Sequence, residues 1–181
     1  MKTNLPKINL GRIQLREIEE GDYIDFYECG KSKKMCETLN WGPFERLFDA
    51  KFVIKAIYLK RPEDGLPKGY AIIYEDKMIG MVEYHSYNNQ NNSIELGYFL
   101  HEDYWNHGIM TKALKAAIKI GFNYLDVDKI IIGSETTNER SLKLIQRLGL
   151  KYEYSLINEY KDTSHLCLYY SIYKYEFKGE D

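Results

Sequence analysis

The sequence predicts a mixed α/β fold in one domain covering residues 1–181, with a central sheet and helices on both faces. Two patterns in the chain lead to this prediction. Runs that alternate polar and apolar residues flank two segments with helical spacing. A strand, a helix and a second strand follow one another there, which predicts a parallel crossover. A hydrophobic content of 44% allows one substantial core, and the chain is short for two.

In the first half of the chain, one strand and two helices precede a three-stranded meander. A short strand over residues 13–16 is followed by a helix that begins at Asp22, whose carboxylate can cap the exposed amides. Helical spacing returns around Phe48 and Phe52 and ends before Pro62. Three β-like runs then cover residues 69–74, 78–87 and 93–100, with turns between them.

In the second half, apolar residues recur at helical intervals over residues 108–124. A compact apolar strand follows at residues 129–133, and a second helix over 138–148 is stopped by Gly149. Two alternating runs at residues 151–158 and 165–177 close the chain as antiparallel strands. The expected sheet is therefore mixed, mostly antiparallel, and built of about seven strands.

Composition excludes several classes of function. The formal charge of -2 leaves no strong basic field, so nucleic acid is not expected as a partner. Cys29, Cys36 and Cys167 form an odd set without a Cys-x-x-Cys pair, which predicts reduced, buried thiols. No signal peptide and no apolar run of membrane-spanning length is found, so a cytoplasmic protein without membrane contact is expected.

The chemically informative stretch is a strand that runs through a short loop into the long helix. A helix N-terminus offers backbone amides and a partial positive charge, which together bind phosphate. Residues 106–111 would supply these amides, and Gly108 would let the backbone approach a diphosphate closely. On this glycine alone, an ordinary strand-loop-helix connection is the favoured explanation of the pattern.

Four blocks in the second half raise this hypothesis above the ordinary connection, because together they resemble a known family. They are Glu95-Leu-Gly-Tyr-Phe-Leu100, Tyr104-Trp-Asn-His-Gly-Ile-Met-Thr111, Thr137-Asn-Glu-Arg-Ser141 and Leu148-Gly-Leu-Lys-Tyr-Glu153. Their order resembles that of GNAT N-acetyltransferases of the RimJ/RimL type, ribosomal-protein N-terminal acetyltransferases. The resemblance covers most of residues 10–175 and implies the GNAT fold and an acetyl-CoA-dependent enzyme.

The resemblance also implies a binding site for acetyl-CoA, the acetyl donor. The strand residues would pair with the pantetheine arm, the loop would hold the diphosphate, and an asparagine would meet the pantetheine amides. Met110 departs from the family's small residue, and Trp105 stands where many members have Gln or Arg. The implied residues are Tyr98, Phe99, Leu100, Asn106, His107, Gly108, Ile109, Met110, Thr111 and Asn138.

Two catalytic assignments are expected. Glu95, with Glu83 as the alternative, would take the proton from an ammonium substrate; an ion-paired strand carboxylate is the structural alternative. Many family members protonate the thiolate with a tyrosine, but the matching position here is Ile145. The resemblance implies that the Ser141 hydroxyl takes its place, whereas a local helix-terminal role is the simpler explanation.

The acceptor stays open at this level. A protein or peptide α-amino group is the leading hypothesis, a small amine such as a polyamine or aminoglycoside is the second, and a non-catalytic acyl-CoA-binding module is the third. A polyamine site would need clustered carboxylates, for which Glu17, Glu19, Glu20, Glu28 and Glu37 are candidates. No metal is expected, since the histidines lack ligand spacing, and a homodimer is consistent with the family.

Overall fold

The computed structural model describes residues 1–178 and contains one eight-stranded sheet in the order β1-β2-β3-β4-β5-β6-β8-β7. Neighbouring strands are antiparallel except β5 and β6, which are parallel. The strands are β1 (Ile8–Leu10), β2 (Ile13–Glu17), β3 (Tyr70–Tyr74), β4 (Lys77–Asn88), β5 (Ser93–Leu100), β6 (Lys129–Glu135), β7 (Lys151–Tyr160) and β8 (Thr163–Tyr173).

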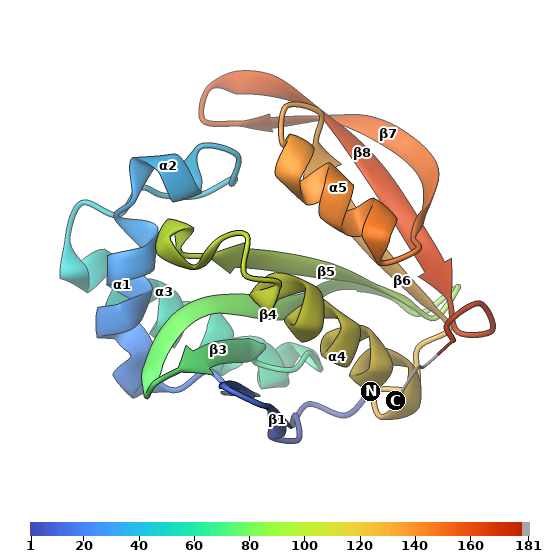
Figure 1. The fold of residues 1–181 in the computed structure, drawn as a ribbon, viewed down its shortest axis with the longest axis horizontal. Coiled ribbons are helices and arrows are strands. Elements are labelled where there is room, and N and C mark those ends of the chain that lie inside the picture. The colour runs from blue at the N-terminus through green and yellow to red at the C-terminus, as the bar shows by residue number, and fades with distance from the viewer. Residues whose placement is uncertain (179–181) are drawn as a thin grey trace.

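Helices cover both faces of this sheet, as the sequence predicts. Figure 1 shows α4 and α5 in front of the strands, with α2 facing α5 across the upper part of the molecule. The α-helices are α1 (Tyr23–Gly30), α2 (Lys33–Cys36), α3 (Leu47–Ala56), α4 (Ile109–Asn123) and α5 (Glu139–Arg147). Three 3-10 helices are η1 (Glu20–Asp22), η2 (Tyr58–Asp64) and η3 (Glu102–Tyr104).

Alternation along the strands divides the buried side chains into two cores. On β5, Ile94 and Leu96 belong to the larger core, which packs against α4 and α5. Phe99 points the other way, into a second core with Phe26 of α1 and Ile54 of α3. The amphipathic pattern over 108–124 therefore forms α4 as predicted, with Leu114, among others, fully buried.

The observed elements differ from the predicted ones at several places. The Asp22 carboxylate does not cap α1, because it accepts hydrogen bonds from the Arg16 guanidinium and the Glu19 amide. The eighth strand is β1, a three-residue edge strand paired with β2, too short to give a recognisable alternation. Strand β8 ends at Tyr173, because the chain then turns back and Phe177 packs on Phe122. Helix α2 is separate from α1, since Ser32 leaves the helix and caps α2 by accepting a hydrogen bond from the Met35 amide.

Two further predictions concern the cysteines and a membrane-spanning segment. Cys29, Cys36 and Cys167 are buried and free of disulfides. Burial raises the pKa of the Cys29 thiol to about 12 and that of the Cys36 thiol to about 11. No helix within residues 1–178 is both long and apolar enough to cross a bilayer.

Candidate active site

A cleft opens where the two parallel strands separate. Strands β5 and β6 pair from Ser93 to Glu95 and from Lys129 to Ile131, after which they diverge, β5 still paired with β4 and β6 with β8. The cleft has a volume of about 260 Å³. Its walls come from α2 and the turn after it, the end of β5, the start of α4, and α5: Lys34, Met35, Glu37, Thr38, Leu39, Tyr98, Phe99, Leu100, Tyr104, Trp105, Asn106, Gly108, Ile109, Met110, Thr111, Asn138, Arg140, Ser141, Leu144 and Arg147.

The loop before α4 presents the helix N-terminus to this cleft. Gly108 is the N-cap residue with φ 72°, and nothing lies within 4 Å of the place where a Cβ would stand. The first backbone bond of the helix runs from the Lys112 amide to the Gly108 carbonyl, 3.1 Å apart, so the amides of residues 109–111 precede the ladder. An open glycine before three helix-terminal amides fits a phosphate group.

The predicted loop residues have different surroundings. Ile109 and Met110 are buried in the larger core, so the bulk of Met110 is accommodated beneath the helix. Asn106 lines the cleft and adopts a left-handed conformation with φ 66°. His107 is exposed and is not among the residues that line the cleft. The backbone of the loop, rather than this imidazole, is the part that the fold directs at a ligand.

The free edge of β5 offers main-chain groups to the same cleft. Hydrogen bonding alternates along an antiparallel pair, and the His101 amide donates to the Ile79 carbonyl at 2.8 Å. By this alternation Phe99 directs its main chain toward β4, whereas Tyr98 and Leu100 direct theirs away from β4. The Leu100 carbonyl already accepts a 2.7 Å hydrogen bond from the Trp105 indole, so the main chain of Tyr98 offers both its amide and its carbonyl, and Leu100 offers its amide.

Tyr98 contributes its side chain as well, which the sequence did not predict. Its hydroxyl lies 2.7 Å from Ser141 Oγ, so a hydrogen bond joins β5 to the start of α5 within the cleft. Burial raises the pKa of Tyr98 to about 12, and the phenol therefore keeps its proton near neutral pH. Ile145, the position where many relatives have a tyrosine, is fully buried in the core.

Asn138 caps α5 and ties it to the opposite wall. Its Oδ1 accepts from the Ser141 amide at 3.1 Å, and its Nδ2 donates to Thr38 Oγ1 at 2.7 Å. A second link between these walls comes from the β7–β8 turn, where Lys161 Nζ donates to the Cys36 carbonyl at 2.7 Å. The end of α2 and the turn after it are thus joined to the C-terminal half by two hydrogen bonds.

Glu95 lies on the other face of the sheet. Its side chain alternates with those of Ile94 and Leu96 and is 24% exposed, with Oε2 3.9 Å from His85 Nδ1. Burial raises its pKa above the usual value for glutamate, and the nearby imidazole lowers it in part. Gly97 is next on this face, and an added Cβ would stand 3.0 Å from Glu83 Oε1.

Glu83, the alternative base, has a cationic partner. The guanidinium of Arg61 donates to its carboxylate and also to the Tyr84 carbonyl, at 2.9 Å. Both side chains are at least four-fifths buried, so this pair sits in a poorly solvated environment. The structural explanation of an ion-paired strand carboxylate therefore holds for Glu83, whereas the basic group beside Glu95 is a histidine.

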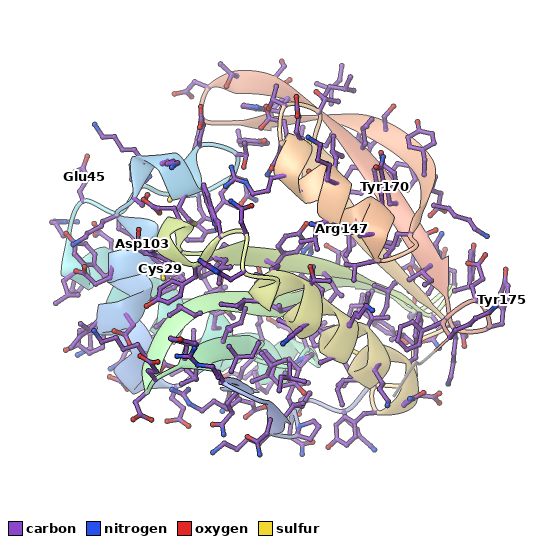
Figure 2. The ribbon with its side chains drawn as sticks, in the orientation of Figure 1. Cys29, Glu45, Asp103, Arg147, Tyr170 and Tyr175 are labelled. Atoms are coloured by element: carbon purple, nitrogen blue, oxygen red, sulfur yellow. The ribbon has the colours of Figure 1, made fainter. Side chains whose placement is uncertain are left out.

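The charged side chains of the cleft suit an anionic ligand. Among its lining residues are three cations, Lys34, Arg140 and Arg147, and one acid, Glu37. Figure 2 shows Arg147 near the end of α5. In residues 1–178 no group of three His, Cys, Asp or Glu side chains is arranged to hold a metal ion.

Several lining residues could not be predicted from local sequence. Helix α2 and the turn after it, with Lys34 and Thr38, are brought to the cleft by tertiary packing. Arg140 precedes the predicted Ser141 directly, so its position beside the site was available from the sequence. The hydroxyl of Tyr98 required knowledge of which way that side chain points.

Comparison with known proteins agrees with this arrangement. Residues 12–151 match the family model described as Acetyltransferase (GNAT) domain. YdaF of Bacillus subtilis (strain 168) is 27% identical over 111 residues, which span 60% of this chain and 61% of that protein. The spermidine N(1)-acetyltransferase of Escherichia coli (strain K12) is 23% identical over 172 residues, 92% of this chain and 90% of that protein.

The fold has solved counterparts. A structure of RimL, a ribosomal L7/L12 alpha-N-protein acetyltransferase in complex with coenzyme A, superposes with a TM-score of 0.82 and 19% identity. The match covers 93% of this chain and 98% of that one.

The double role of Asn138 generates a stability prediction. Asn138→Ala removes both the cap and the bridge to Thr38, and we expect a loss of about 1 kcal/mol in the free energy of unfolding. Thr38→Val removes only the bridge and should cost less, because the Asn138 amide can still bind water. Urea denaturation measures both, and equal losses would contradict the capping role.

Proposed function

Because the chain belongs to the GNAT family, in its RimJ/RimL-type branch, and is an acetyl-CoA-dependent N-acetyltransferase, we propose that its acceptor is the α-amino group of a protein or peptide. The observation that carries this choice is the placement of the acidic residues near the N-terminus. A polyamine needs several free carboxylates together, and here they are individually engaged.

Three of the five candidate carboxylates have their own lysine partners. Glu17 Oε2 lies 3.7 Å from Lys68, and Glu28 Oε2 lies 2.7 Å from Lys31. Glu20 is 2.8 Å from Lys55. The fourth, Glu19, forms the cap of η1 with Asp22, whose carboxylate accepts from the Glu19 amide. Among residues 1–178, Glu37 is then the candidate without such a contact, which supports an acceptor with a single cationic amine rather than a polycation.

The residues of the cleft are suited to hold the donor. Acetyl-CoA, when bound, supplies a thioester carbonyl open to attack by an amine and a thiolate leaving group. The amides of residues 109–111 would hold its diphosphate, and the main chain of Tyr98 would fix the pantetheine arm as an added strand does.

Glu95 is the proposed proton acceptor for the ammonium group. The cleft residues Tyr98 and Ser141 lie on the α5 side of the sheet, and Glu95 points to the opposite side. Past residue 95 the strands part, so an acceptor that approaches from the Glu95 side can reach the donor through the gap. A carboxylate with a raised pKa is a stronger base than an ordinary glutamate.

Ser141 is the proposed hydrogen-bond donor to the leaving sulfur. Tyr98 can donate to Ser141 Oγ, which would leave the serine proton free to point at the negative charge that develops on sulfur. A phenol that keeps its proton near neutral pH is suited to this supporting role.

The acceptor assignment predicts a substrate preference. Peptides with a free N-terminus should release CoA from acetyl-CoA, and the same peptides with a blocked N-terminus should not. Spermidine and spermine, tested at equal concentration, should be turned over at least about tenfold less efficiently, as judged by kcat/KM. Efficient turnover of a polyamine with none on peptides would overturn the assignment.

Replacement of Glu95 should lower the catalytic rate without lowering the stability of the fold at neutral pH. Glu95→Gln should lower kcat by about 100-fold or more and abolish the acidic limb of the pH profile of kcat/KM. The raised pKa means that folding disfavours the ionised form, so stability present at low pH is lost as the pH rises through that pKa. Glu95→Gln should therefore be at least as stable as the parent at neutral pH.

The matched control for this prediction is Glu83→Gln. It breaks the buried pair with Arg61 and should destabilise the protein, while the acidic limb of the pH profile remains. If instead Glu83→Gln abolished that limb and Glu95→Gln kept it, the two roles would have to be exchanged.

The hydroxyl pair predicts non-additive effects on the rate. Ser141→Ala and Tyr98→Phe should each lower kcat by about tenfold, with KM for acetyl-CoA nearly unchanged. Because Tyr98 acts through Ser141, the double variant should be no slower than Ser141→Ala alone. Steady-state kinetics measures all three, and multiplicative losses would show that the two hydroxyls act separately.

A further inference from the structure

The indole of Trp105 is held in place beside two cations at the mouth of the cleft. Its Nε1 donates to the Leu100 carbonyl at 2.7 Å. The Arg140 guanidinium lies over its ring with Cζ 3.4 Å from the ring centroid, and Lys34 Nζ lies 5.3 Å from the same centroid. The three residues come from α5, α2 and the loop before α4, and all line the cleft.

The position of Arg140 is electrostatically unfavourable without a ligand. It stands in the first turn of α5, where the helix dipole disfavours a cation. No salt bridge to either Arg140 or Lys34 is formed by any carboxylate of residues 1–178. The neighbouring Glu139 pairs instead with Lys143, at 3.0 Å. Arg147 differs, because it lies at the other end of α5, where a cation is favoured.

The Trp105 ring also fixes the position of the Arg140 guanidinium relative to the loop before α4. Trp105 immediately precedes Asn106 and Gly108, whose backbone leads into the open N-terminus of α4. The cation–π contact therefore holds the guanidinium near the same loop that presents the helix amides. The start of α4 and the two cations therefore belong to the lining of one cleft.

We propose that Arg140, positioned on the Trp105 ring and assisted by Lys34, binds the diphosphate of CoA together with the α4 amides. The guanidinium can donate two hydrogen bonds to phosphate oxygens, which the loop amides alone would leave exposed. Bound phosphate would also supply the counter-charge that Arg140 lacks. This inference rests on the proposed binding of the donor in the cleft.

Calorimetric titration without turnover tests the assignment. Arg140→Gln should weaken CoA binding by about tenfold. The loss should be the same with dephospho-CoA, which has the diphosphate but no 3′-phosphate, and should disappear with pantetheine, which has neither. Trp105→Leu, which removes the ring, should produce part of the same loss. Because the Arg140 side chain is exposed, Arg140→Gln should leave thermal stability intact. Trp105→Leu removes a ring that packs against both cores, so its melting temperature is measured beside its CoA binding.

The charge-matched control is Lys143→Gln, on the same helix and outside the cleft lining, which should bind CoA as the parent does. A loss confined to CoA and absent with dephospho-CoA would assign Arg140 to the 3′-phosphate and overturn the proposal. An equal loss with pantetheine would overturn it too. If the parent protein failed to bind CoA at all, the proposed function itself would fail, whereas normal binding by Arg140→Gln would remove only this inference.

Discussion

The short pairing between β5 and β6 is the constraint on which the rest of the site depends. Three residues of each strand are joined, and then the strands part. Inside a continuous sheet, the main-chain groups of Tyr98 would bond to a neighbouring strand and be lost to a ligand. Because they are not, the sheet has an internal edge that is reachable from solvent, and the gap connects its two faces. The larger core under α4 and α5 stabilises the sheet on the donor side.

The two faces of the sheet differ in the charges that they carry near the gap between β5 and β6. The donor side carries cations and helix-terminal amides around the cleft, although the whole chain has a formal charge of -2. The other face places Glu95 beside His85 in partly buried surroundings. An anionic donor and a cationic acceptor would therefore be drawn to opposite sides of one gap.

The elements with long, regular patterns could be predicted from the sequence, and the short ones could not. Helix α4 and the β3–β5 meander follow directly from their periodicity. The edge strand β1 and helix α2 have three and four residues, which is too few to show a period. In the site, the loop backbone around Gly108 was foreseen from residue type. The contacts Tyr98–Ser141 and Arg140–Trp105 join segments distant in sequence, and local patterns carry no information about them.

One wall of the cleft joins the two halves of the chain. Helix α2 has a single turn whose Met35 and Cys36 are buried in the second core, and Cys36 and Thr38 are tied to the C-terminal half by the Lys161–Cys36 and Thr38–Asn138 hydrogen bonds. These two contacts and the buried side chains of α2 together fix the distance between the walls, so the width of the cleft is set jointly by both halves of the chain.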